Sequence, residues 1–462
     1  MSLNSDLERR YEEYLAEVME VHRARGVAVA VIDRVGRTLW QKLAGYRDAE
    51  RRLAIDEDTI FGLASLTKSF TALLVTQLAE RGSLSLQDPV SVHCPSFRDA
   101  GPNPVRLAHL LSHSGGYFPL PRTTLEPVAK ELGLPLDGPE DPAFSDELAR
   151  AGVDRVAGAM SAASERVGEP GEYMSYCNDG YGLLAEVIHR ASGAGSYAAC
   201  VRREVLEPLG MTRSSCEFLR PAQDANVAKL YSEAAPEGDL NFCRNAFVLM
   251  GGGAMKSTLA DMKKYLRMYL NEGAIDGGGR LASARGVRAM CRPRIPTRSQ
   301  QFYGYGLSIS FLEDVTVIRH GGSLPGVSSH MAWSPELERG VVVLCNTEDV
   351  PVSLLADAAL RLSMGLDPRP ASRWRRCPWT DATLRAACGR YESGEGADVL
   401  VERDGEGVAV TNSGKVMEVL MVHPFRAVLR SGLSETEFRL HFGEDGEVWG
   451  ARLGDRIVKK RS

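Results

Sequence analysis

The chain has 462 residues, of which 44% are hydrophobic and 25% charged, a balance typical of folded globular proteins. Its formal net charge of −5 offers no basic surface to a polyanion, so we expect no nucleic-acid partner. The N-terminal residues are charged and no apolar run approaches membrane-spanning length, so we expect a cytoplasmic protein without a membrane partner.

The length predicts two or three domains, and the oligomeric state stays open. The nine cysteines are odd in number and no pair is spaced as C-x-x-C. This pattern argues against a disulfide framework and against a zinc ribbon. No metal or other cofactor is expected, because the chemistry that the motifs below indicate needs none.

The chain opens with an amphipathic helical pattern over residues 7–23. Two strands are predicted at 27–34 and 37–46, with Val35 and Gly36 in the turn of a hairpin. Residues 65–81 then repeat their apolar side chains at helical spacing, and Gly82 closes that helix. The helix is apolar over much of its circumference, which predicts that it is buried.

Residues 117–170 are rich in proline, glycine and charge, and we expect an insertion of loops and helices that roofs a cleft. Helices are predicted at 180–191 and 260–270, and strands at 295–311, 316–322, 328–336 and 340–346. Strands therefore lie at both ends of this region with helices between them. That order predicts a mixed α+β fold rather than a repeat of βαβ units.

Proline and arginine concentrate near residues 365–378, as in a linker between domains. Eight short β-like runs separated by turn residues follow, and they predict a small antiparallel barrel. We therefore expect a catalytic domain at 1–367, with a helical subdomain and cleft insertion at about 85–250. A linker at 368–378 and a barrel domain at 379–462 complete the chain, and no catalytic constellation is evident in the barrel.

Ser65 and Lys68 form the only Ser-x-x-Lys in the chain. If the serine opens a helix, residues three apart share a face and the lysine amine reaches the serine hydroxyl. A neutral lysine accepts the hydroxyl proton, which requires that burial or a second positive charge lowers its pKa. The helix N-terminus also directs backbone N–H groups toward a developing oxyanion. Lys68 stands in an otherwise apolar helix, where a buried charge is unfavourable unless it is paired, so its presence indicates a function.

A second motif, Tyr176-x-Asn178, follows a Pro-Gly turn just ahead of a helix. A tyrosine beside a lysine ammonium is held as phenolate or shares its proton, and an asparagine binds a substrate carbonyl. A third motif, His320-Gly321-Gly322-Ser323, follows a strand. Paired glycines let another backbone approach closely, and the Ser323 N–H is a candidate second oxyanion donor.

These three motifs in this order resemble the serine β-lactamase and penicillin-binding-protein superfamily, whose first motif is S-x-x-K. The combination S-x-x-K, Y-x-N and H-x-G is similar to the class C-type branch, which includes D-aminopeptidases, esterases and peptide-cyclising thioesterases. Residues 110–116, 251–261 and 303–307 match supporting segments of the same family. The resemblance covers about residues 27–367.

The resemblance implies an α/β/α sandwich, in which an antiparallel sheet lies beside an all-helical subdomain and the active site lies in the cleft between them. It implies Ser65 as nucleophile, Lys68 and Tyr176 as proton shuttle, and Asn178 as a substrate-orienting group. It also implies an oxyanion hole made by the backbone N–H groups of Ser65 and Ser323. The C-terminal barrel is similar to the lipocalin-like domain that some of these enzymes carry beside the cleft.

One departure concerns His320, because the third motif often begins with a lysine whose charge favours a substrate carboxylate. A histidine is largely neutral at pH 7 unless its pKa is raised. We therefore expect a serine hydrolase that forms an acyl-enzyme on Ser65 and cleaves an amide, a peptide with or without D-residues, or a small ester. The partner would be a small-molecule or peptide substrate. Two alternatives stay open: a peptide acyltransferase or cyclising thioesterase using Ser65, and a catalytically inactive binding or sensor domain.

Overall fold

The computed structural model describes residues 5–99, 102–121, 125–133, 146–217, 224–232, 249–369 and 374–461. Its larger part is built on a nine-stranded antiparallel sheet in the order β3-β2-β1-β11-β10-β9-β8-β7-β6. The strands of this sheet are β1 (Gly26–Asp33), β2 (Thr38–Asp48), β3 (Leu53–Ala54), β6 (Ile295–Pro296), β7 (Gln301–Tyr303), β8 (Ser308–Leu312), β9 (Val315–Leu324), β10 (Val327–Ser334) and β11 (Arg339–Cys345).

The neighbouring strands β1 and β11 come from opposite ends of this larger part and pair in antiparallel register from Val27 with Cys345 to Asp33 with Arg339. Every residue of β1 is buried, because alternate side chains enter different cores. Ala28, Ala30 and Ile32 face one core, while the valines between them face the other. A strand buried on both faces is apolar throughout, which explains the unbroken VAVAVI run.

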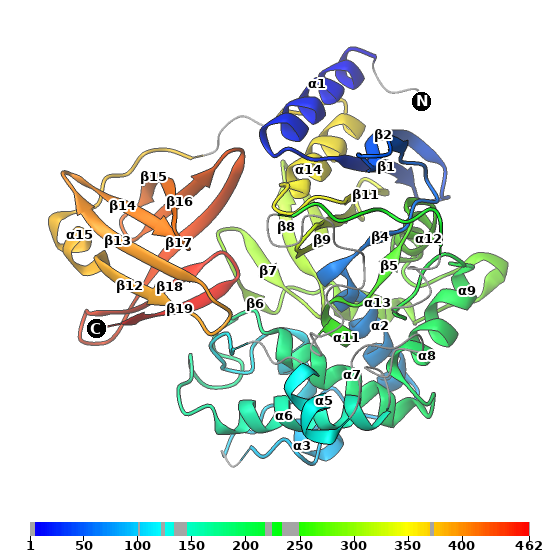
Figure 1. The fold of residues 1–462 in the computed structure, drawn as a ribbon, viewed down its shortest axis with the longest axis horizontal. Coiled ribbons are helices and arrows are strands. Elements are labelled where there is room, and N and C mark those ends of the chain that lie inside the picture. Colours follow the sequence, from blue (N-terminus) through cyan, green and yellow to red (C-terminus); the bar gives the residue numbers. More distant parts are fainter. Residues whose placement is uncertain are drawn as a thin grey trace.

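Helices cover both faces of this sheet (Figure 1). The helices α1 (Ser5–Val21) and α14 (Val352–Ser363) pack together over the core that contains Val27. On the opposite face lie α2 (Thr67–Glu80) and α12 (Leu259–Leu270), over the core that contains Ala28. Thr258 caps α12 by accepting a hydrogen bond at Oγ1 from the Asp261 N–H, as an N-cap threonine does.

A helical part lies beside the sheet and packs around α7 (Figure 1). Its elements and the short turns near it are α3 (Val90–His93), α4 (Leu107–Leu111), α5 (Leu125–Leu132), α6 (Asp146–Ala162), α7 (Asn178–Ser192), α8 (Tyr197–Val201), the π-helix η3 (Arg202–Leu206), α9 (Glu207–Leu209) and α11 (Leu249–Gly253). The strand β4 (Phe61–Gly62) precedes the turn η1 (Ala64–Leu66) and pairs with β5 (Lys256–Ser257), which precedes α12. The turn η4 (Asp276–Gly278) and α13 (Ala284–Met290) follow α12.

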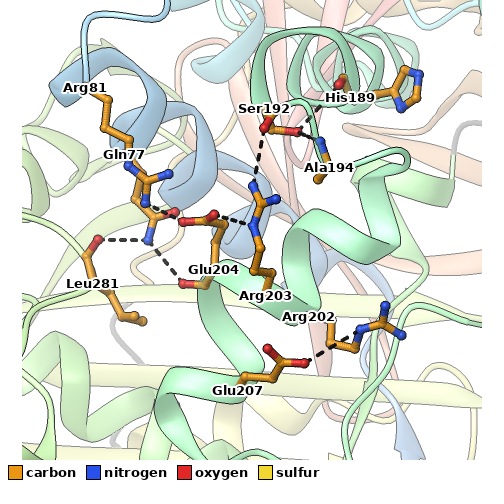
Figure 2. Close-up of polar contacts among 10 residues, drawn as sticks. All are labelled: Gln77, Arg81, His189, Ser192, Ala194, Arg202, Arg203, Glu204, Glu207 and Leu281. Carbon is orange, nitrogen blue, oxygen red and sulfur yellow. Dashed lines mark hydrogen bonds and ion pairs between the residues drawn. The ribbon is translucent and has the colours of Figure 1, made fainter.

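The C-terminal end of α2 is tied to the helical part by polar contacts (Figure 2). Arg81 pairs with Glu204 of η3, and Gln77 donates from Nε2 to the carbonyl of Leu281 at 2.8 Å. The same amide nitrogen lies 3.4 Å from the carbonyl of Glu204. These contacts hold the C-terminal end of α2 in place.

The C-terminal part is a closed barrel of eight antiparallel strands in sequence order (Figure 1). Its interior is filled by side chains such as Trp379, Tyr391 and Phe438, so the barrel has a packed core. The helix α15 (Asp381–Ala387) precedes the strands, which are β12 (Gly389–Glu392), β13 (Asp398–Asp404), β14 (Gly407–Asn412), β15 (Lys415–His423), β16 (Arg426–Ser431), β17 (Ser434–Phe442), β18 (Val448–Leu453) and β19 (Arg456–Arg461).

The predicted fold class is confirmed, including the antiparallel sheet, the helices and the eight-stranded barrel. The helices α14 and α15 are additions that the sequence analysis did not include. Of the expected insertion at 117–170, residues 122–124 and 134–145 lie outside the described residues, and α5 and α6 form much of the remainder. Within the described ranges, no helix is long and apolar enough to cross a membrane.

Candidate active site

Ser65 lies in the turn η1, directly ahead of α2, and its side chain is partly exposed while its neighbours are buried. Ala64 has a φ of +48°, which is an uncommon conformation for a residue with a Cβ and stores strain beside the serine. Two hydrogen bonds hold it: Thr67 donates from Oγ1 to the Ala64 carbonyl at 2.7 Å and accepts from the Met255 N–H at 3.0 Å. The strained turn presents Ser65 at the start of the helix.

Lys68 is fully buried in the first turn of α2 and donates from Nζ to three neutral oxygens. These are Ser65 Oγ at 3.1 Å, Asn178 Oδ1 at 2.8 Å and the Gly252 carbonyl at 2.8 Å. Burial disfavours the ammonium form, and the positive charge of Arg456 adds to this effect, while no carboxylate among the described residues contacts the amine directly. Together they lower the pKa of Lys68 to about 7, so a large fraction is neutral at physiological pH.

Tyr176 is buried, and its ring centroid lies 4.8 Å from Lys68 Nζ. Burial raises the pKa of the Tyr176 phenol well above its usual range, although a hydrogen bond with Ser65 and the charge of Arg456 offset part of this rise. The phenolate form considered from the sequence is therefore disfavoured. Tyr176 is a neutral phenol that has a proton to donate.

The β9–β10 pair forms the wall opposite Ser65. A Cβ added at Gly322 would lie 2.1 Å from the Leu63 carbonyl oxygen and 2.9 Å from the Ser65 backbone nitrogen, so only glycine permits this approach. Ser329, which pairs with Gly322 across the strands, donates from Oγ to the same Leu63 carbonyl at 2.6 Å. The backbone of β9 thus lies directly against the serine turn, and Ser323 follows as the next residue.

His320, in the β9 strand of this wall, is buried and neutral. Its Nδ1 lies 2.6 Å from the Gly321 carbonyl, so that nitrogen carries the proton and Nε2 accepts from the Tyr303 hydroxyl at 2.8 Å. Burial and the nearby charge of Lys68 lower the pKa of His320 to about 4. A fixed positive charge at this motif is therefore absent at neutral pH.

The barrel, which the sequence analysis expected beside the cleft, also supplies side chains to the site. Glu395, in the turn between β12 and β13, accepts a hydrogen bond from Asn178 Nδ2 at 2.8 Å. Arg456, at the start of β19, donates from Nε to Glu395 at 2.5 Å, and its guanidinium carbon lies 5.0 Å from the Tyr176 ring centroid. The Asp455 carbonyl accepts from the Tyr176 N–H at 2.9 Å. The runs of β-like sequence gave no indication of these contacts.

A cavity of about 690 Å³ opens at Ser65 and extends between the sheet and the barrel. Six of the eight predicted site residues line it, namely Ser65, Tyr176, His320, Gly321, Gly322 and Ser323, while Lys68 and Asn178 lie behind them and contact each other. The barrel supplies other lining residues, including Asp455 and Arg456. Described residues of the expected roof at 117–170 supply none of the lining.

Two further residues of the site came from segments that the sequence analysis noted only as supporting matches. His113 accepts from the Cys177 N–H at Nδ1, 3.1 Å away, and its ring centroid lies 4.1 Å from that of Tyr176. Gly252 supplies the carbonyl that Lys68 binds. A Cβ at Gly252 would lie 3.3 Å from Lys68 Nζ, so the small residue leaves room for the amine.

Comparison with known proteins finds relatives along most of the chain. A family model described as Beta-lactamase matches residues 11–365. Penicillin-binding protein 4* of Bacillus subtilis (strain 168) is 26% identical over 95% of this chain and 94% of its own length. Esterase EstB of Burkholderia gladioli is 32% identical over 50% of this chain and 57% of its own length.

The fold has close counterparts among solved structures. The octameric penicillin-binding protein homologue from Pyrococcus abyssi has a TM-score of 0.67 and 27% identity, and the match covers 98% of this chain and 100% of that one. SurE, solved with D-Leu, has a TM-score of 0.70 at 22% identity and covers 99% of each chain. At that identity, the likeness to SurE concerns the fold alone.

Proposed function

Because the chain belongs to the β-lactamase family, we propose that it is a serine hydrolase that forms an acyl-enzyme on Ser65 and cleaves an amide or a small ester. The family match and the relatives described as a penicillin-binding protein and an esterase support a serine hydrolase in general. The observation that carries the finer proposal is the contact between Ser65 Oγ and a buried lysine whose pKa is near 7.

The proposed reaction has two steps. Ser65 Oγ attacks the substrate carbonyl carbon while its proton passes to neutral Lys68, and the carbonyl oxygen becomes an oxyanion facing the backbone N–H groups of Ser65 and Ser323. The oxyanion then collapses, the bond to the leaving group breaks, and Tyr176 protonates that group. Lys68 returns a proton to Tyr176, and water attacks the acyl-enzyme to release the acid and restore Ser65.

Charge balance in the cavity favours a substrate whose acyl part is uncharged. Among the residues that the structure describes, three arginines line the cavity and each has a carboxylate partner: Arg298 pairs with Asp455, Arg319 with Asp357 and Arg456 with Glu395. His320 is neutral, as described above. A substrate carboxylate would therefore need to displace an existing ion pair, whereas a neutral ester or peptide carbonyl would not. The cavity volume suits a small molecule or a short peptide.

Initial rates on a paired panel test this proposal. The panel contains p-nitrophenyl acetate and butyrate, D- and L-alanine p-nitroanilide, and nitrocefin, each assayed with the wild type and with Ser65→Ala. Turnover of the anilides that Ser65→Ala lacks would assign an amidase, and the D/L ratio would give its stereochemical preference. Turnover of the esters only would assign an esterase.

The panel also separates the two alternatives. An acyltransferase would deliver the acyl group to an added amine, so mass spectrometry would detect the amide product in place of the acid. A binding domain without activity would show neither turnover nor labelling of Ser65 by a fluorophosphonate. That last outcome would refute the proposed function.

A further inference from the structure

The barrel places a partly buried ion pair against the catalytic centre. Glu395 accepts from Asn178 Nδ2 through Oε1 at 2.8 Å and from Arg456 Nε through Oε2 at 2.5 Å. The Glu395 side chain is only 10% exposed, so water competes little for these two bonds. On its other end, the Asn178 amide accepts from Lys68 Nζ through Oδ1. A continuous chain of hydrogen bonds thus runs from the barrel to the catalytic lysine.

We propose that Glu395 is a positioning residue supplied by the barrel: it fixes the orientation of the Asn178 amide and, through it, directs the Lys68 lone pair at Ser65. The catalytic centre is then complete only when the barrel is docked. This inference rests on the proposed function, because it concerns the lysine base of that reaction.

The chemistry of the amide explains why its orientation matters. A neutral lysine amine has two N–H donors and one lone pair. Asn178 Oδ1 and the Gly252 carbonyl only accept, so they take the two N–H groups of Lys68. The lone pair is left to face the third neighbour, Ser65 Oγ, which is the geometry that a general base requires.

A reversed Asn178 amide would undo this arrangement. Its Nδ2 would then face Lys68 and donate to the lone pair, which would no longer be available to Ser65. Its oxygen would also face the Glu395 carboxylate, where two acceptors meet without a proton between them. The carboxylate of Glu395 therefore favours the productive orientation, because only Nδ2 can donate to it.

The turn that carries Glu395 is built to hold this position. Gly394 donates from its backbone nitrogen to the Pro119 carbonyl at 3.0 Å, and a Cβ at Gly394 would lie 2.5 Å from the Pro121 backbone nitrogen. Within the turn, Ala397 donates from its backbone nitrogen to Ser393 Oγ at 3.2 Å. The barrel turn is thus seated directly on the catalytic domain.

The second contact of the barrel lies on the other side of Asn178. The turn between β18 and β19 runs along the Tyr176 motif: Asp455 accepts from the Tyr176 N–H, and the Ile457 N–H donates to Ser175 Oγ at 3.2 Å. Arg452 donates to the Met174 carbonyl at 2.7 Å. The barrel therefore binds the backbone of the segment that carries Tyr176 and Asn178, the two residues that Arg456 and Glu395 contact.

Glu395 also acts on Lys68 through its charge, and this effect must be separated from its effect on the orientation of the Asn178 amide. Glu395 raises the pKa of Lys68 and Arg456 lowers it. Nearby, burial with the charge of Glu395 raises the pKa of Asp179 to about 7. The titratable and charged groups around Lys68 are His113, Tyr176, Cys177, Asp179, Tyr181, His320, Glu395 and Arg456. A change in charge near Lys68 moves the midpoint of the pH–rate profile. A reversed Asn178 amide instead lowers the plateau rate at high pH, where Lys68 is already neutral.

The test measures the rate constant for labelling of Ser65 by a fluorophosphonate from pH 5.5 to 9.5, in the full chain. Glu395→Ala should lower the high-pH plateau by about tenfold or more. Glu395→Gln keeps an oxygen that accepts from Asn178, so it should recover much of that loss. Gly394→Ala keeps the carboxylate but displaces its turn, and it should lower the plateau as well. Circular dichroism confirms that each variant is folded.

Glu165→Gln is the matched control, because Glu165 pairs with Lys459 and Arg461 across the same contact between barrel and catalytic domain, at exposed positions. Its plateau should equal that of the wild type. A Glu395→Ala plateau within about twofold of the wild type, or an equal loss in Glu165→Gln, would overturn the inference. Wild-type protein that is not labelled at Ser65 would instead refute the proposed function, and the inference with it.

Discussion

Replacing Gly322 by alanine should disable the enzyme by separating β9 from the serine turn. The new Cβ would lie 2.1 Å from the Leu63 carbonyl oxygen, whereas carbon and oxygen without a covalent bond stay about 3.3 Å apart. The strand must therefore retreat by about 1 Å, and a misplacement of that size costs about a hundredfold in rate. We expect kcat/KM for p-nitrophenyl butyrate to fall by about that factor, with about 1–3 kcal/mol of lost stability from overpacking.

The neighbouring glycine provides the comparison. A Cβ at Gly321 would lie 3.1 Å from the ring of His330 and 3.5 Å from the nearest backbone atom, compared with 2.1 Å for the closest contact of a Cβ at Gly322. Gly321→Ala should therefore lose less than about tenfold in kcat/KM. Steady-state rates and thermal unfolding of both variants test the reasoning. If Gly322→Ala retains wild-type kcat/KM, or if Gly321→Ala is the more damaged of the two, the close approach of β9 does not set the geometry of the site.

Of four other predictions, two concern Lys68, one concerns Tyr176 and one concerns the docking of the barrel. Burial lowers the pKa of Lys68 to about 7, and the neutral amine is the base. We therefore expect kcat/KM to be lost below about pH 6 and to rise through about pH 7 to a plateau. A profile that is flat from about pH 5 to 9 would contradict this role. The unfolded chain binds that proton up to the ordinary lysine pKa of 10.5, so the free energy of unfolding should rise between pH 7 and 10.5 by up to about 5 kcal/mol through this group. Lys68→Met should lack that rise when the two proteins are compared by urea unfolding. Tyr176→Phe should slow anilide hydrolysis by about a hundredfold and p-nitrophenyl ester hydrolysis far less, because nitrophenolate leaves without a proton; equal losses would argue against Tyr176 as the acid. Arg298→Ala removes the two hydrogen bonds to Asp455 at 2.9 and 2.7 Å. Limited proteolysis should therefore release the barrel faster than in the wild type. An unchanged cleavage rate would show that this ion pair does not hold the barrel in place.

The parts of the fold that could be predicted are those with a local pattern. The hairpin of β1 and β2 has an apolar run closed by a glycine turn, and the eight barrel strands alternate with turn residues. Helix α14 also has such a pattern, because Leu355, Ala359 and Leu362 are buried and stand at helical spacing. The pairing of β1 with β11 has no local signature, because it joins segments more than three hundred residues apart.

The candidate site also has residues that a local sequence pattern predicts and residues that no local pattern predicts. Ser65 and Lys68 are three residues apart, so their contact follows from helix geometry. The residues of the other two motifs were predicted from the roles that their side chains and backbone groups can take in acyl transfer. Glu395 stands 217 residues from Asn178, in a turn whose sequence is ordinary for a surface loop. A carboxylate in such a turn is usually solvated. Only the docking of the barrel gives this one a buried partner, and docking cannot be derived from the pattern of a single strand or turn.

The position of β1 between β2 and β11 has a consequence for how the protein is made. During synthesis, β1 and β2 leave the ribosome early, but β1 keeps an open edge until Cys345 and its neighbours have been synthesised. Contacts so distant in sequence form slowly, and an apolar strand with an unpaired edge is prone to aggregate in the meantime. Each barrel strand, in contrast, pairs with its neighbour in sequence, and only β12 and β19 must find each other across the domain. Assembly of the nine-stranded sheet, rather than of the barrel, should therefore limit the yield of folded protein.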